Sequence, residues 1–212
     1  MQYLRHPPGP PLAHLVDYLW SLRDVPGHAM ERIVPSGTLE LVVNLDEDEV
    51  RVYGADGVTC RRFAGAVVSG AYRKWFTIDT REHASIVGVH FKPGGALPVL
   101  GVPPGTLADQ HVELDALWPR FAGELREQLC AAATPATRFE VLEQALLVRL
   151  GHQRAGNGAV TFALDQLGPC PRTGDLAPWY ALTATLHTTG CTRCIAHIGF
   201  AHVRVAGSQE VQ

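Results

Sequence analysis

Turn residues divide the first half of the chain into short apolar segments, and this pattern limits the folds that the chain can adopt. Residues 1 to about 112 are rich in Val, Ile, Gly and Pro. Segments of strand length recur with turn signals roughly every 8–12 residues, a spacing typical of an antiparallel barrel or sandwich. A parallel sheet would instead alternate strands with long helical patterns. The pattern therefore favours an antiparallel β-barrel-like N-terminal domain.

The candidate strand over residues 38–45 changes from polar to apolar along its length. Thr38 and Glu40 place polar groups on its outward face, and the following residues are apolar on both faces, as in a strand that enters a core. Asp56 and Gly57 form a hairpin turn of the Asp-Gly type. The predicted strands are residues 38–45, 50–53, 58–60, 75–80 and 84–91.

Helical periodicity replaces this pattern over residues 113–150. One apolar stripe predicts a single helix, and it consists of Leu114, Leu117, Phe121, Leu125 and Leu129. Thr134 before Pro135 predicts the N-cap and first residue of a second helix. Gly151 predicts the end of that helix.

Residues 156–212 lose this regularity. They hold three arginines and three acidic residues, a net charge of zero that suits a phosphate-binding module poorly. Five potential metal ligands lie within 16 residues: His187, Cys191, Cys194, His197 and His202. Their spacing does not match the usual zinc-finger order, so we interpret them as incidental rather than as a zinc site. We expect a short, partly irregular helical segment here.

The composition narrows the classes of function. Lys and Arg number 18 and Asp and Glu number 21, giving a net charge of −3, so any nucleic-acid surface must be local. The chain shows neither a signal-peptide pattern nor an apolar run of membrane-spanning length. Without a secretory signal, its five cysteines predict a reduced, cytoplasmic protein without a membrane segment.

Two further clusters have competing interpretations. Basic and aromatic residues interleave at Arg61, Arg62 and residues 72–76, where they could stack bases and contact phosphate. The favoured interpretation is strand alternation, with the cations in solvent and the aromatic rings in the core. His83, His90 and His111 share no ligand register and are expected to be hydrogen-bonded rather than metal-binding.

Several segments resemble the sensor halves of AraC/XylS-type transcriptional regulators. The resemblance covers about residues 3–165. It lies in residues 32–45 (RIVPSGTLELVVNL), residues 88–96 (GVHFKPGGA), and residues 100–103 leading through 107–109 to Leu114 and Trp118. In that family such a stretch implies a β-rich effector or dimerisation domain, then linker helices, then two helix-turn-helix units.

The C-terminal part departs from the family pattern. A first helix-turn-helix unit places an Ala four residues before the turn Gly, whereas Ala196 lies three residues before Gly199. Ala201 stands where a capping hydroxyl is expected. If a recognition helix forms, His202 and Arg204 are the candidates to face the groove and Arg193 lies nearer the phosphates. The alternative interpretation is that these three residues lie in a tail that binds no partner.

These observations predict an α+β protein with three parts: a β-rich sensor domain (1–112), a helical linker and dimerisation pair (113–155) and an incomplete helix-turn-helix segment (156–212). The resemblance implies a homodimeric, ligand-sensing DNA-binding regulator, and we expect its DNA-binding part to be truncated or frame-disrupted. Its partners would be DNA and a small-molecule effector. We expect no enzymatic activity, no cofactor and no metal. The alternative function is a stand-alone small-molecule sensor that acts through protein partners.

Overall fold

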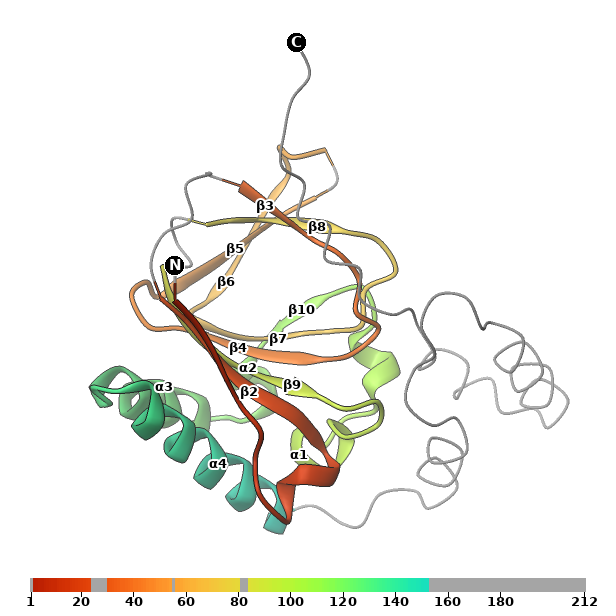
Figure 1. Ribbon diagram of the computed structural model, residues 1–212. Helices are drawn as coiled ribbons and strands as arrows, with labels where there is room; N and C mark the ends of the chain where they lie inside the picture. The colour runs from red at the N-terminus through yellow and green to blue at the C-terminus, as the bar shows by residue number, and fades with distance from the viewer. Residues whose placement is uncertain (1, 24–29, 55, 81–83, 153–212) are drawn as a thin grey trace, which may run out of the picture.

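The computed structural model describes residues 2–23, 30–54, 56–80 and 84–152, and within them the chain forms two antiparallel sheets followed by helices (Figure 1). The six-stranded sheet has the order β1 (Gln2–His6), β2 (Val16–Arg23), β9 (Ser85–Phe91), β4 (Glu40–Asn44), β7 (Ala66–Ser69) and β10 (His111–Glu113). The four-stranded sheet has the order β3 (Met30–Ile33), β8 (Phe76–Asp79), β5 (Glu49–Tyr53) and β6 (Cys60–Ala64). The predicted α+β class is confirmed, although the two sheets do not close into a single barrel.

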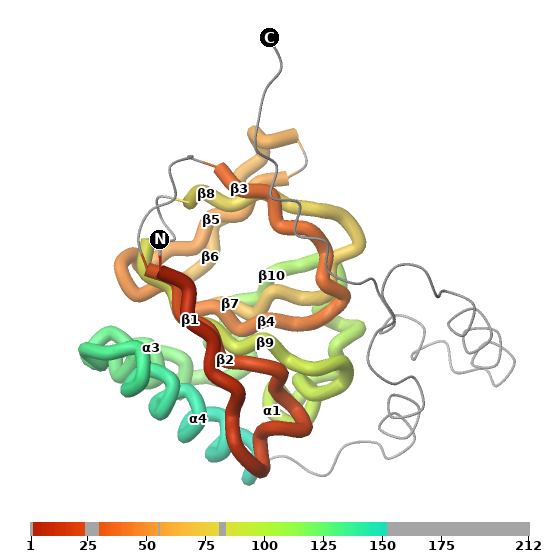
Figure 2. The backbone as a smooth tube through the Cα atoms, viewed as in Figure 1, coloured from red at the N-terminus to blue at the C-terminus, as the bar shows by residue number. Residues whose placement is uncertain are grey.

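The elements form three layers. Figure 2 shows the four-stranded sheet on one side of the six-stranded sheet and the helices on the other side. Strand β9 lies in the middle layer between β2 and β4, and every one of its residues is buried. A strand covered on both faces reads as a continuous apolar run rather than as an alternating one, which explains the composition of residues 85–91.

Alternation along the middle strands supplies two separate cores. Leu41 and Val43 of β4 pack in the main core with the helices, whereas Val42 between them packs toward the four-stranded sheet. Strand β7 repeats the arrangement, with Val68 in the main core and Val67 in the second. The side chains of the second core therefore pack between the two sheets.

The predicted helix over residues 114–129 is wrong in one respect, because it is broken into α2 (Leu114–Leu117) and α3 (Phe121–Ala131). Pro119 has no backbone N–H to continue the helical hydrogen-bond ladder. Arg120 adopts a positive φ of 65°, which takes the chain out of the helical region. The apolar stripe itself holds, since Leu114, Leu125 and Leu129 are all buried.

Helix α4 (Pro135–His152) begins where the sequence predicts. The backbone N–H of Thr137 donates a hydrogen bond to Thr134 Oγ1 at 3.2 Å, as an N-cap requires. Gly151 lies inside the helix, so the predicted end at that residue is wrong. The remaining short helices are η1 (Leu12–His14), α1 (Leu97–Leu100) and η2 (Pro104–Leu107).

The turn after β9 requires glycine at two positions. Gly94 has a φ of 75°, which residues with a side chain rarely adopt. A Cβ on Gly95 would lie 1.9 Å from the backbone oxygen of Leu15. These two glycines form a tight turn that brings the end of β9 against the start of β2. In the described part of the chain, no helix combines the length and the apolar character that crossing a membrane requires.

Candidate ligand-binding site between the sheets

The two sheets enclose a cavity of about 110 Å³. Its walls are mainly apolar and come from both sheets: Trp20, Ile33, Val42, Val50, Val67, Phe76, Ile78 and Ile86. A small set of polar side chains converges on it: Ser36, Thr38, Glu40, Ser69, Tyr72 and His111. An apolar cavity with few convergent polar groups is the usual form of a small-molecule site.

The first polar group is centred on His90, which is 5% exposed. His90 lies opposite Glu40 in the pairing of β9 with β4, and its Nδ1 is 2.7 Å from Glu40 Oε1. An ionised carboxylate can only accept, so Nδ1 carries the proton. His90 Nε2 is 3.2 Å from Thr38 Oγ1, and Tyr18 stacks on the imidazole at 4.7 Å. These contacts fix the ring and hold Glu40 at the cavity wall.

Glu40 therefore corrects one sequence-based prediction. Its side chain was expected on the outward face of the strand, yet it is half-buried and lines the cavity. The reason is that the four-stranded sheet covers this face of the six-stranded sheet. Thr38 stands beside it, and its hydroxyl is 2.8 Å from that of Ser36. Hydroxyls, carboxylate and imidazole thus form one hydrogen-bonded chain.

The second polar group pairs His111 with Tyr72. His111 is 6% exposed and stands opposite Ser69 in the pairing of β10 with β7. The Tyr72 hydroxyl is 2.7 Å from His111 Nδ1. Phe76 meets the imidazole edge-on, with the ring centres 4.9 Å apart. Ring contacts with Phe63, Tyr72 and Phe76 and the hydrogen bond to Tyr72 hold His111 in place.

Burial sets the protonation of this pair's phenol. It raises the pKa of Tyr72 to about 12, and the nearby Arg61 opposes part of that rise. The hydroxyl therefore keeps its proton at neutral pH and stays hydrogen-bonded to His111. The hydroxyls of Ser36 and Thr38 and the Glu40 carboxylate, in an apolar setting, can orient a small polar molecule.

The sequence identified only part of this site. His90 and His111, expected to be hydrogen-bonded rather than metal-binding, are both hydrogen-bonded and buried. Tyr72 was assigned to the basic and aromatic cluster, and its role in the cavity was missed because it depends on the approach of β10. Within the ranges that the structure describes, no three His, Cys, Asp or Glu side chains gather closely enough to hold a metal ion.

The predicted DNA contacts are not placed by the structure. Arg193, His202 and Arg204 lie outside the described residues, as does the whole segment 156–212. The same holds for His83 and for the cysteine and histidine cluster that includes Cys191 and Cys194.

Comparison with protein-family models gives a match over the β-rich part of the chain. A family model described as a domain of unknown function (DUF6597) matches residues 4–113. The matched range includes every strand of both sheets except the first two residues of β1, and it ends with β10. Among curated proteins, none matches the chain.

Proposed function

The chain belongs to the DUF6597 family, and from this premise we propose that it is an AraC-type transcriptional regulator that senses a small molecule and dimerises. The family supports the proposal because this domain is known as an N-terminal domain of AraC-type regulators. The resemblance of residues 32–45 and 88–96 to AraC-type sensor halves points the same way. We propose no enzymatic activity for the chain.

The observation that carries the proposal is the inter-sheet cavity. Its position inside a β-rich module, with polar groups from β4, β7 and β10, suits reversible binding of a small effector. At about 110 Å³ the cavity is smaller than the roughly 300–1,000 Å³ of typical ligand sites. An effector would therefore push the two sheets apart on binding.

Such a displacement of the sheets could transmit effector binding from the cavity to the helices. Strands β4 and β9 have one face on the cavity and the other on the main core, where α3 and α4 pack. A shift of these strands would change the position of the helices. In a homodimer that assembles through the helices, the change would alter the spacing of the two DNA-binding segments.

DNA contact is assigned to the segment beyond the helices. Arg193 would bind phosphate, and His202 and Arg204 would face the bases. Residues 156–212 of each protomer hold only three arginines, so binding depends on both protomers of a dimer engaging at once.

An electrophoretic mobility-shift assay tests the proposal. The full-length protein is titrated against the DNA upstream of its own gene at low salt, and its dimeric state is checked by light scattering. We expect a retarded band, and Arg204→Ala should weaken binding by about tenfold, the loss typical of one base contact. Arg51→Ala is the matched control, because this arginine pairs with Glu49 in the four-stranded sheet, away from the helices, and its loss should leave DNA binding unchanged.

The alternative function makes the opposite prediction. A folded dimer that binds no upstream fragment at low salt would overturn the regulator proposal. It would favour a stand-alone sensor that acts through protein partners. The family match and the cavity would remain valid in that case, because neither depends on DNA.

A further inference from the structure

A second and larger cavity opens at the end of the β5–β6 hairpin. It has a volume of about 630 Å³, within the roughly 300–1,000 Å³ range of typical ligand sites. We call it the hairpin groove, and its lining is Val52, Tyr53, Gly54, Thr59, Arg61, Tyr72, Arg73, Lys74, Trp75, Phe76 and Asp109. Tyr72 and Phe76 also line the inter-sheet cavity, so these two side chains form a shared wall.

Strand alternation directs Arg61 into this groove. In the pairing of β5 with β6, Arg61 stands opposite Val52, whereas Arg62 stands opposite Arg51. Directly opposed residues of an antiparallel pair share one face of the sheet. Val52 is buried in the second core, so Arg61 lies on the inner face of the sheet and Arg62 on the outer face.

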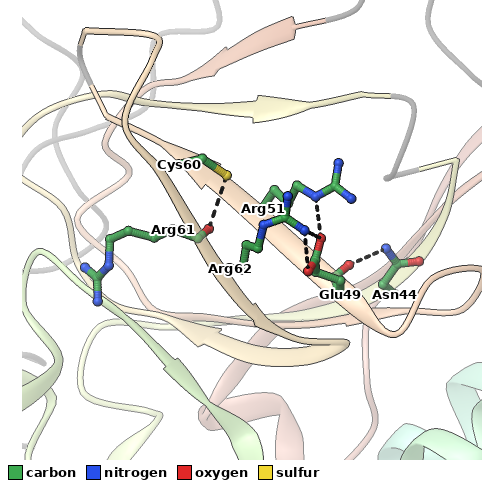
Figure 3. A network of polar contacts seen from close by, with 6 residues as sticks. All are labelled: Asn44, Glu49, Arg51, Cys60, Arg61 and Arg62. Atoms are coloured by element: carbon green, nitrogen blue, oxygen red, sulfur yellow. Dashed lines mark hydrogen bonds and ion pairs between the residues drawn. The ribbon is translucent and has the colours of Figure 1, made fainter.

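Figure 3 shows the two adjacent arginines extending in different directions. Arg62 Nη1 lies 3.0 Å from both carboxylate oxygens of Glu49, and Arg51 binds the same carboxylate. Arg61 extends away from that cluster, with its guanidinium 5.1 Å from the centre of the Phe63 ring. The outer arginines thus share the Glu49 carboxylate, whereas Arg61 pairs with no carboxylate among the described residues.

The groove as a whole carries excess positive charge. Its three cations are Arg61, Arg73 and Lys74, and its one carboxylate is Asp109, so the net charge is +2. Arg73 Nε lies 2.6 Å from Asp109 Oδ2 and is neutralised there. Lys74, like Arg61, forms no ion pair with a carboxylate in the part of the chain that the structure describes. Two cations therefore remain for a ligand.

Aromatic side chains supply the other walls of the groove. Tyr53, Tyr72, Trp75 and Phe76 all line it, and aromatic faces bind flat rings by stacking. The favoured interpretation of this cluster placed its rings in the core and its cations in solvent. Phe76 is buried as predicted, but Trp75 and Tyr72 are only half-buried and share the groove with the cations.

We propose that the hairpin groove binds a phosphate monoester carried on a planar ring. The dianionic group would lie against Arg61 and Lys74, matching the local charge of +2, and the ring would stack on the aromatic wall. A small molecule fits better than a nucleic acid strand because the cations are confined to one bounded cavity rather than spread along a stripe. This site is separate from the inter-sheet cavity, and its occupancy does not depend on DNA binding.

Isothermal titration calorimetry of the full-length protein with phenyl phosphate at pH 7.5 and low salt tests the proposal. We expect saturable binding that weakens by about tenfold or more in Arg61→Gln and in Lys74→Gln, as expected for one charge-assisted hydrogen bond. Arg62→Gln is the matched control and should bind like the wild type, because Arg62 faces the opposite side. Phenol and inorganic phosphate, each lacking one half of the ligand, should bind at least about tenfold more weakly.

The pH dependence gives a second readout. The second pKa of a phosphate monoester is about 6. Binding should therefore weaken as the pH falls below that value, because the phosphate group loses one of its two negative charges. All three substitutions are at exposed positions, and circular dichroism melting checks that each variant folds. The proposal is overturned if the folded wild type does not bind phenyl phosphate, or if Arg62→Gln loses as much affinity as Arg61→Gln. Tighter binding of a single-stranded oligonucleotide, lost in the same Arg61→Gln variant, would also overturn it in favour of a nucleic-acid surface.

Discussion

Replacement of Tyr72 by Phe tests the arrangement of the inter-sheet cavity. The change removes one hydroxyl and leaves the ring, so the apolar area that Tyr72 buries against Phe76 is retained. What is lost is the 2.7 Å hydrogen bond to Nδ1 of His111, a residue that is 6% exposed. Loss of the partner of a buried polar atom costs about 1–3 kcal/mol. For a chain of this size, each kcal/mol lowers the melting temperature by about 2–4 °C.

Urea unfolding followed by tryptophan fluorescence measures this cost. A double-mutant cycle with His111→Phe separates the pair from its surroundings, and we expect a coupling energy of about 1 kcal/mol. The reasoning would be refuted if Tyr72→Phe unfolds within about 0.3 kcal/mol of the wild type and the cycle gives no coupling. In that case the hydroxyl would be hydrogen-bonded to water in the folded protein.

Three further predictions concern the framework around the site. Thr134→Ala should destabilise the protein by about 1 kcal/mol because it removes the cap of α4, whereas Thr134→Ser should be close to neutral in the same urea titration. Gly88→Ala should cost about 1–3 kcal/mol by overpacking, since its Cβ would lie 2.5 Å from the Trp20 ring and 2.7 Å from the backbone oxygen of Leu41; a cost near zero would show that β9 and Trp20 can shift freely. The pKa of Asp109 is lowered, mainly by the hydrogen bond from the Arg73 backbone N–H, so its carboxylate should stabilise the fold above about pH 4 and lose that contribution as the pH falls toward the lowered pKa. NMR titration of Asp109, compared with the free value of about 3.9, checks the last prediction, and an unshifted Asp109 would contradict it.

The strands that the sequence predicts are those whose residues carry a strong apolar pattern. Strands β4, β8 and β9 fall within predicted ranges, and β5 begins one residue before its predicted range. The hairpin turn also holds: Gly57 has a φ of 67°, and the Asp56 carboxylate accepts hydrogen bonds from the backbone N–H groups of Val58 and Thr59. In these segments local patterning and final burial agree, so the sequence alone is sufficient.

The strands that were missed lie mostly at sheet edges. Strands β1 and β10 form the two edges of one sheet, and β3 and β6 form those of the other. An edge strand needs no continuous apolar face; β6, for example, has four exposed residues among its five. Such segments become strands only because a neighbouring strand offers backbone hydrogen bonds, and their own residues carry little signal for that pairing.

The candidate site was harder to predict than the fold. The contact of Glu40 with His90 joins residues 50 positions apart through the register of β4 on β9, and Tyr72 with His111 spans 39 positions. No local pattern encodes either register. The inner position of Arg61 follows from alternation once β6 is known to be a strand, but the predicted strand ended at Cys60, before Arg61.

The preference of the full-length protein for its own upstream DNA tests the central claim most directly. Fluorescence anisotropy at one fixed salt concentration would compare that fragment with a scrambled fragment of equal length. A dimeric regulator should bind its own fragment at least about a thousandfold more tightly. Equal affinities for the two fragments, from a folded dimer, would contradict the account.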